Sequence, residues 1–143
     1  MNLCTIGTRS VVTIEPDAPV AAVACSMNNR SVGSVIVVED GKPIGIITDR
    51  DLVVRVLCKG REPGTTTARD VMSTSLTTIM EEADALTCLG RMREAHVRRL
   101  PIIGGDGELI GIVALDDLAY HLARCHHELA EAIGAFPIPH EGG

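Results

Sequence analysis

The sequence has almost no aromatic residues. It contains one Tyr, one Phe and no Trp in 143 residues, although 45% of its residues are hydrophobic. The core must therefore be built from aliphatic side chains and methionine. The scarcity of aromatic rings argues against binding of single-stranded nucleic acid, which uses such rings as stacking platforms. A formal net charge of −6 argues against a general nucleic-acid surface as well.

Long apolar runs and paired cysteines are also missing. No run approaches the roughly 20 apolar residues that span a bilayer, and the N-terminal MNLCTIGTRS lacks the basic and apolar parts of a secretory signal. The five cysteines are scattered without a C-x-x-C pair, which favours free thiols in a reducing compartment. We expect a cytoplasmic protein with no membrane partner and no nucleic acid as its main partner.

What the sequence does contain is an internal repeat. The segment GIITDRD from Gly45 matches GIVALDD from Gly111, and upstream VGSVIVVEDGKPIGIITDRDL lies over VRRLPIIGGDGELIGIVALDDL with one extra residue. Further upstream, Met27 matches Met92. Because an internal repeat marks a supersecondary unit, the chain is predicted to contain two copies of one unit.

Each copy has the pattern of a strand, a helix, two strands joined by a hairpin, and a second helix. The first helix is expected to start at Asp17 or Ala18, with Val20, Val23 and Met27 on one face. SVIVV is typical of a strand buried on both faces, and an Asp-Gly turn leads to the return strand. We predict an α+β fold of two β-α-β-β-α repeats, packed with pseudo-twofold symmetry into one body.

Composition indicates the boundaries between the copies. The stretch KGREPGTTTARD is rich in Gly, Pro and Thr, and the end AFPIPHEGG has two prolines and two terminal glycines. Such termini are poorly ordered unless they are tied down. We predict a first copy at 1–60, a linker at 61–70, a second copy at 71–134 and a flexible tail at 135–143.

The repeated motifs resemble those of the cystathionine-β-synthase (CBS) domain. The resemblance rests on Gly-hydrophobic-hydrophobic-Thr-x-x-Asp after an Asp-Gly hairpin, on DVMS at the head of a copy and on VRRLPI at a second strand. It covers Ile6 to about Arg124. It implies a stand-alone tandem CBS pair of bacterial type. Such pairs usually associate as homodimers through their helical faces, and this chain is expected to do the same.

The strand-to-helix junction of the first copy carries groups suited to a nucleotide. Backbone N–H groups and the positive end of a helix dipole lie beside Thr48, whose hydroxyl both donates and accepts. The Asp51 carboxylate can accept two hydrogen bonds from a ribose diol. The resemblance implies that this Thr and Asp hold the ribose of an adenosine ligand. The alternative is that Thr48 or Asp49 caps the helix and Asp51 is a first-turn acid.

The resemblance also implies what surrounds the ribose. Arg98 and Arg99 would bind phosphates through their planar donors, unless they form surface ion pairs with Glu94 or Asp49. The residues expected around the adenine, through backbone groups or as apolar cover, are Ile46, Ile47, Leu76 and Thr77.

A complementary, weaker site is expected from the other halves of the two copies. Its residues would be Val11, Val12, Gly33, Ser34 and Asp117. Ala114 lacks the hydroxyl of Thr48, and Gly33-Ser34 stands where the other site has two arginines. A neutral hydrogen bond is worth about 0.5–1.5 kcal/mol and a charged one more. This site should be vacant, weak, or suited to a ligand without phosphates such as S-adenosylmethionine.

The cysteines and histidines allow two other interpretations. His121 and Cys125 are four residues apart on a predicted helix, followed by His126 and His127, but no C-x-x-C or third cluster completes a zinc site. A nucleophilic cysteine is also unsupported, because nothing places one at a strained turn or in a positive pocket. We expect no metal and no catalytic residues, and a polar C-terminal helix that contacts a second copy.

These features favour a non-catalytic sensor. It would bind an adenosyl nucleotide (AMP, ADP or ATP, with NAD and S-adenosylmethionine as further candidates) between the copies and act on a separate, unknown regulated protein. No other cofactor is expected. The alternative is a ligand-free structural module for dimerisation. Ala114 favours this alternative for one site, whereas Thr48, Asp51 and the arginines disfavour it for the other.

Overall fold

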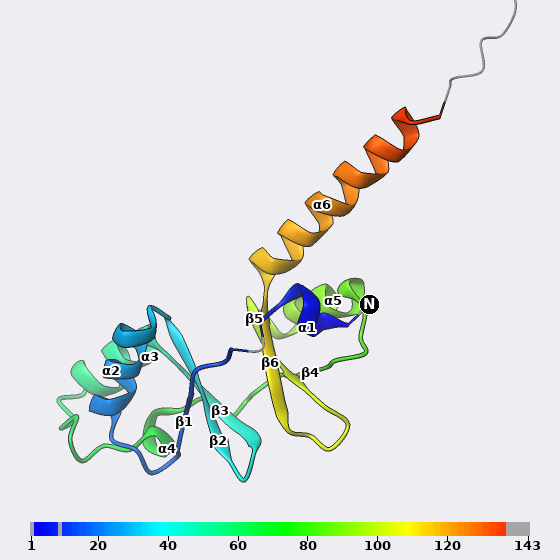
Figure 1. The fold of residues 1–143 in the computed structure, drawn as a ribbon. Helices are drawn as coiled ribbons and strands as arrows, with labels where there is room; N and C mark the ends of the chain where they lie inside the picture. Colours follow the sequence, from blue (N-terminus) through cyan, green and yellow to red (C-terminus); the bar gives the residue numbers. More distant parts are fainter. Residues whose placement is uncertain (1, 9, 137–143) are drawn as a thin grey trace, which may run out of the picture.

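The computed structural model describes residues 2–8 and 10–136, which form two similar halves (Figure 1). The first half consists of β1 (Thr13–Ile14), α2 (Val20–Arg30), β2 (Ser34–Glu39), β3 (Lys42–Thr48), α3 (Asp49–Leu52) and the π-helical turn η1 (Val53–Leu57). The second half consists of β4 (Ile79–Met80), α5 (Ala85–Ala95), β5 (Arg99–Ile103), β6 (Leu109–Ala114) and α6 (Leu115–Gly134). Two short helices precede the halves, α1 (Leu3–Ile6) and α4 (Ala68–Val71). The predicted α+β repeat is confirmed.

The two sheets have the same topology and the same irregularity. Their strand orders are β1-β2-β3 and β4-β5-β6, with the first pair of each parallel and the second antiparallel. The register shifts at equivalent places, after Val37 and after Ile102. Both hairpins use a glycine with positive φ, Gly41 at 78° and Gly107 at 83°, as their Asp-Gly turns predict. The sequence repeat is therefore a structural repeat.

The helices of the first half are shorter than predicted. The first one begins at Val20 rather than at Asp17 or Ala18, and Pro19 is its N-cap. A residue before proline is disfavoured in the helical conformation, and the Ala18 carbonyl accepts instead from the Ala68 N–H at 2.8 Å. The second predicted helix, DRDLVVRVLCKG, is α-helical only over α3 and continues as the π-helical turn η1.

Each half receives the short helix that precedes the other half. The first core consists of Val20, Val23, Met27, Val35, Val37, Ile47, Val56, Ala68 and Val71. The second core consists of Leu3, Cys4, Ile79, Cys88, Met92, Leu100, Ile102, Val113 and Leu118. Thus α1 packs into the second core although it precedes the first half, and α4 packs into the first core although it precedes the second. Separating the halves would expose these buried side chains to water.

The repeated glycine of the two strand-to-helix motifs is explained by these crossing segments. Thr8, just after α1, exchanges two backbone hydrogen bonds of 2.9 Å with Ile112 on β6. A Cβ added to Gly111 would lie 2.8 Å from the Thr8 carbonyl oxygen. At the equivalent position, a Cβ on Gly45 would lie 2.5 Å from the Met72 sulfur. Close packing therefore requires glycine at Gly111, where the neighbour is backbone, and a side chain at Gly45 would force Met72 to move.

The free energy of unfolding should depend on pH through two capping carboxylates. Hydrogen bonds from the Thr67 and Thr87 backbone N–H groups, aided by the threonine hydroxyls, hold the pKa values of Asp70 and Asp84 below the ordinary 3.8. Since the folded pKa values are depressed, this stabilisation is present above about pH 4 and is lost as pH falls through them. Urea unfolding from about pH 6 to pH 3 should show the loss. An Asp70→Asn, Asp84→Asn variant should lose less stability over this range, and an unchanged pH dependence would contradict the assignment.

The last helix, α6, projects away from the two halves (Figure 1). Among residues 2–8 and 10–136, no helix has the length and apolar character needed to cross a membrane. Of the predicted tail at 135–143, Ala135 and Phe136 are described and the rest lies outside the described residues.

Candidate functional site

Two clefts lie where the halves meet, and the larger one contains the predicted main site. Its volume is about 670 Å³, within the 300–1,000 Å³ usual for small-molecule sites. All predicted main-site residues except Ile47 line it, namely Ile46, Thr48, Asp51, Leu76, Thr77, Arg98 and Arg99. The end of β3 and the start of α3 supply one wall, and the segments before β4 and at the start of β5 supply the other. We call this the main cleft.

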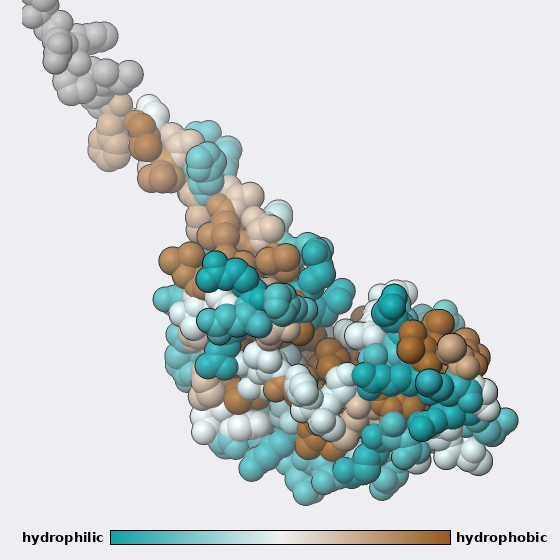
Figure 2. Space-filling view, turned by 180° about the vertical axis from the view of Figure 1, so that it is seen from behind, coloured by the Kyte–Doolittle hydropathy of each residue, from teal (hydrophilic) through white to brown (hydrophobic). Residues whose placement is uncertain are grey.

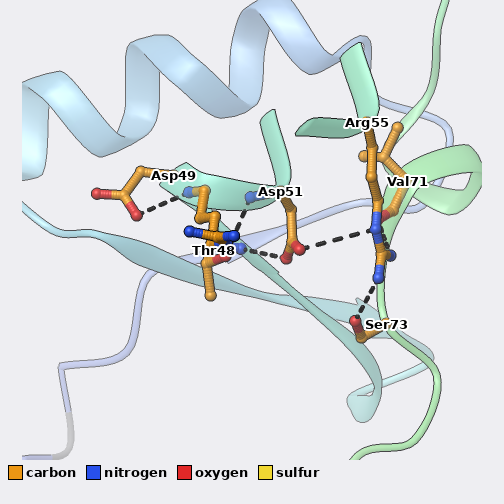
Figure 3. Close-up of polar contacts among 7 residues, drawn as sticks. Thr48, Asp49, Asp51, Arg55, Val71 and Ser73 are labelled. Carbon is orange, nitrogen blue, oxygen red and sulfur yellow. Dashed lines mark hydrogen bonds and ion pairs between the residues drawn. The ribbon is translucent and has the colours of Figure 1, made fainter. Parts of the chain in front are cut away.

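Thr48 and Asp51 form a reciprocal cap at the start of α3 (Figure 3). The Thr48 N–H donates to Asp51 Oδ2 at 2.8 Å, and the Asp51 N–H donates to Thr48 Oγ1 at 3.2 Å. Thr48 and Asp51 therefore do cap the helix, as the alternative to ribose binding predicts. The cap leaves binding capacity unused, because the Thr48 hydroxyl keeps its donor and a carboxylate has about four acceptor positions.

Arg55 is a neighbour of this cap that the sequence analysis missed. Its Nε lies 3.7 Å from Asp51 Oδ1, and its guanidinium donates to the Val71 carbonyl at 2.7 Å and to Ser73 Oγ at 3.3 Å (Figure 3). The guanidinium thus connects η1 to the last residue of α4 and to the segment after it, and it contacts the Asp51 carboxylate from the side. Its position four residues after Asp51, on the same helical face, was the signal that could have revealed it.

The two predicted phosphate-binding arginines have different surroundings. Arg98 forms an ion pair with Asp116 at 3.4 Å, rather than with Glu94 or Asp49, and both side chains are largely exposed. An exposed ion pair of this kind stabilises a protein by about 0–1 kcal/mol, so Arg98 could leave Asp116 for another anion at little cost in free energy. Arg99 lies opposite Ala114 in the β5–β6 pair and lines both clefts. Both predicted arginines therefore line the main cleft.

Several lining residues differ from the prediction. Ile47 is completely buried in the first core and does not face the main cleft. Residues that were not predicted to line it are Ser34, Asp49, Arg50, Ser73, Ser75, His96 and Val97. His96 and Val97 directly precede the two arginines, and Ser73 and Ser75 precede Leu76 in MSTSL, so sequence adjacency was the available signal for these residues. They add hydroxyl groups, an imidazole and an apolar side chain, and Asp49 and Arg50 add one charge of each sign.

The smaller cleft contains every predicted residue of the weaker site. Its volume is about 260 Å³, below the usual range for a small-molecule site, and its lining includes Val11, Val12, Gly33, Ser34 and Asp117. The Ala114 N–H donates to Asp117 Oδ2 at 2.8 Å, as Thr48 does to Asp51. No side-chain cap is present at Ala114. The two clefts are thus equivalent in backbone geometry but unequal in size and in hydroxyl groups.

The other cysteines and histidines among residues 2–8 and 10–136 do not line the main cleft. In the described part of the chain, no group of three His, Cys, Asp or Glu side chains is placed to hold a metal ion. His121 Nε2 and Cys125 Sγ are 3.5 Å apart on the exposed surface of α6. Burial raises the pKa of the Cys88 thiol, so this cysteine stays protonated and acts as an apolar core residue.

Comparison with known sequences matches both halves to one family. The family model described as CBS domain matches residues 4–57 and 68–124. Uncharacterized protein MK0525 of Methanopyrus kandleri is 39% identical over 114 residues, covering 79% of this chain and 58% of the relative. CBS domain-containing protein YhcV of Bacillus subtilis is 38% identical over 117 residues, covering 78% of this chain and 79% of the relative. The chain therefore spans less than two-thirds of the first of these relatives.

Solved structures share the fold. The crystal structure of Hypoxic Response Protein I with two coordinated zinc ions matches with a TM-score of 0.77 and 29% identity, covering 85% of this chain and 98% of that one. The CBS domain protein PAE2072 from Pyrobaculum aerophilum, complexed with AMP, matches with a TM-score of 0.74, covering 87% of this chain and 99% of that one. At 17% identity, the second likeness concerns the fold alone.

Proposed function

This chain belongs to the CBS domain family, and we propose that it is a non-catalytic sensor that binds an adenosine nucleotide in the main cleft and signals to a separate protein. The observation that carries the proposal is the composition of this cleft. A hydroxyl and a carboxylate from one half face two arginines and a polar loop from the other half. A ligand that contacts both walls can favour one arrangement of the halves over another, which is the requirement for regulation.

The polar groups of the main cleft fit the parts of an adenosine nucleotide. The unused acceptor positions of Asp51 and the hydroxyl of Thr48 suit a ribose diol, since both lie at the same end of β3. Arg98 and Arg99 supply the charge that phosphates require. Backbone groups at Leu76 and Thr77 would meet the adenine edge. The AMP complex of PAE2072 adds that a protein of this fold accepts such a ligand.

The smaller cleft is proposed to be the weaker site. It contains Ala114 where the main cleft has the hydroxyl of Thr48, and its lining includes Arg99. Because Arg99 lines both clefts, a phosphate bound in the main cleft would draw this side chain away from the smaller one. We therefore propose that one nucleotide per chain binds tightly. Free thiols at all five cysteines support the cytoplasmic location that we propose with this function.

A ligand-free dimerisation module is the second candidate function. It is favoured by the cap itself, because Thr48 and Asp51 satisfy each other's backbone groups without any ligand. On this alternative, the backbone geometry shared by the two strand-to-helix junctions serves only the fold. The homodimer that we also propose then carries out the function. The alternatives differ in whether the main cleft binds anything.

Calorimetric titration separates these candidates. AMP, ADP, ATP, NAD and S-adenosylmethionine are titrated in turn into the purified full chain. We expect at least one to bind with a dissociation constant below about 1 mM, equivalent to about −4 kcal/mol, at about one ligand per chain. The affinity for nucleotides with more phosphates should fall more steeply as the salt concentration rises, because salt screens the attraction between the phosphates and the two arginines. If none of the five binds below about millimolar, the sensor proposal is wrong and the dimerisation module stands.

A further inference from the structure

Arg55 contacts the wall of the main cleft from outside its lining. It is not among the residues that line the cleft, but Asp51 and Ser73 are, and its guanidinium contacts both (Figure 3). Arg55 lies in the middle of η1, a single π-helical turn. Such turns are rare and occur frequently at functional sites. Any effect of Arg55 on a ligand therefore passes through the residues that it contacts.

Each carboxylate oxygen of Asp51 has its own partner within the chain. Oδ2 accepts from the Thr48 N–H at 2.8 Å, and Oδ1 lies 3.7 Å from Arg55 Nε. Contacts at both oxygens restrict rotation of the carboxylate, so its remaining acceptor positions have set directions before a ligand arrives. A group that is already oriented loses less conformational entropy when it binds. Arg55 thus helps to orient the group that is proposed to hold the ribose.

Arg55 is itself held at the other end of its guanidinium. It donates to the Val71 carbonyl at 2.7 Å and to Ser73 Oγ at 3.3 Å. The Ser73 backbone has a separate anchor, because it exchanges hydrogen bonds of 2.9 and 3.1 Å with Ile46 on β3. The segment that begins at Ser73 would therefore stay on β3 without Arg55. Replacing Arg55 should disturb the Asp51 carboxylate more than the rest of the cleft wall.

The second half places a different group behind its carboxylate. In the alignment of the two repeats, His121 corresponds to Arg55, and Asp117 corresponds to Asp51. His121 belongs to α6, which projects away from the body (Figure 2), and its Nε2 lies 3.5 Å from Cys125 Sγ. Among residues 2–8 and 10–136, the ion pairs do not include one between His121 and Asp117. Within this part of the chain, Asp51 therefore has a basic partner that its counterpart does not have.

We infer that Arg55 is a positioning residue that makes the main cleft selective for adenine ribonucleotides over nucleotides whose sugar lacks hydroxyls. With Arg55 in place, the free acceptor positions of Asp51 meet a ribose diol in a fixed orientation. Without Arg55 the carboxylate turns more freely, and a ribose then gains less over a sugar that cannot donate. The inference rests on the proposed nucleotide binding, and it adds the residue that sets the sugar selectivity of that site.

Calorimetric titration with two sugar forms of one nucleotide tests this role. AMP and ATP, each with its dideoxy form that lacks both ribose hydroxyls, are titrated into the full chain of the wild type and of Arg55→Gln. We expect the wild type to bind the ribose form at least about tenfold more tightly than the dideoxy form. Arg55→Gln should bind the ribose form at least about fivefold more weakly than the wild type does, and the dideoxy form within about twofold.

Arg69→Gln is the matched control. The Arg69 side chain is 48% exposed against 43% for Arg55, it forms an ion pair with Glu39, and it does not line the main cleft. This variant should keep the wild-type affinity for both sugar forms. Circular dichroism checks the fold of both variants. Should Arg55→Gln not fold, Arg55→Lys takes its place, because an ammonium group lacks the planar fork of donors that reaches several partners together.

Three outcomes overturn the inference while nucleotide binding stands. The first is an equal loss of both sugar forms in Arg55→Gln, which would show a general effect on the cleft. The second is no loss of either form in that variant. The third is a wild type that binds both sugar forms equally, because there is then no selectivity for Arg55 to set. A wild type that binds neither AMP nor ATP refutes the proposed function itself, and the inference with it.

Discussion

Replacement of Asp51 by alanine is expected to weaken nucleotide binding to the main cleft by about 10- to 100-fold. The carboxylate would accept hydrogen bonds from the ribose, and each charged hydrogen bond is worth about 1.5–3 kcal/mol, where 1.4 kcal/mol is a factor of ten. Calorimetric titration of Asp51→Ala with the tightest ligand of the wild type measures the loss. The variant should also be slightly less stable, because it breaks the 2.8 Å bond between the Thr48 N–H and Asp51.

A second cap in the same chain provides the matched control. Thr67 and Asp70 form the same reciprocal cap at the start of α4, with the Thr67 N–H donating to Asp70 at 2.9 Å. Neither residue is among the lining residues of the main cleft. Asp70→Ala should therefore also lower stability slightly, because it removes the same kind of cap bond, without changing nucleotide affinity. If both variants lose affinity equally, the loss comes from stability and not from a ribose contact.

The corresponding change in the smaller cleft checks which site is used. Asp117→Ala should leave the affinity for the tightest nucleotide within about threefold of the wild type, since that cleft lacks a hydroxyl at Ala114. Should Asp117→Ala abolish binding while Asp51→Ala does not, the assignment of main and weaker site is inverted.

Leu3→Ala is expected to lower the free energy of unfolding by about 2–5 kcal/mol, the range for removing a large aliphatic side chain from a core. Leu3 is completely buried in the second core, and its N–H donates to the Glu81 carbonyl at 3.2 Å. A terminal residue would normally be tolerant of substitution. We expect a large effect because α1 packs into the core of the second half, which is distant from α1 in the sequence. Urea unfolding followed by circular dichroism measures it.

An exposed leucine serves as the control for this stability measurement. Leu57 on η1 is 70% exposed, and Leu57→Ala should change the free energy of unfolding by no more than about 0.5 kcal/mol. Equal, small effects of Leu3→Ala and Leu57→Ala would contradict the packing of α1 into the second core. Leu3→Ala should also change the shape of the smaller cleft, because a displaced α1 moves Thr8, which lines that cleft.

The repeat, the sheets and the hairpins could be predicted because their signals are local. An aliphatic run between turn residues and an Asp-Gly pair specify a strand and a hairpin within a few residues. The packing of α1 could not be predicted in the same way. Nothing in the sequence of Leu3 and Cys4 says which of two similar cores they fill, and the answer depends on the path of the chain between α1 and α2. The late start of α2 had a local signal in Pro19, since the preceding residue avoids the helical conformation.

The main cleft was predicted from motifs, and its one misplaced residue follows from strand geometry. Ile46 and Ile47 are consecutive on β3, and consecutive side chains of a strand point to opposite faces. Only one of them could line the cleft, and the structure places Ile46 there and Ile47 in the first core. The double role of Arg99 depends instead on β5 lying between the two clefts. That arrangement arises from the packing of the two halves, and no spacing of residues in the sequence indicates it.

A crystal structure of the full chain grown with millimolar AMP tests the central claim most directly. We predict one nucleotide in the main cleft, with the ribose hydroxyls on Asp51, the Thr48 hydroxyl beside them and the phosphate on Arg98 or Arg99. An AMP molecule found only beside Asp117 and Ala114 in the smaller cleft would contradict the site. Crystals whose main cleft stays empty under these conditions would contradict adenosine-nucleotide sensing itself.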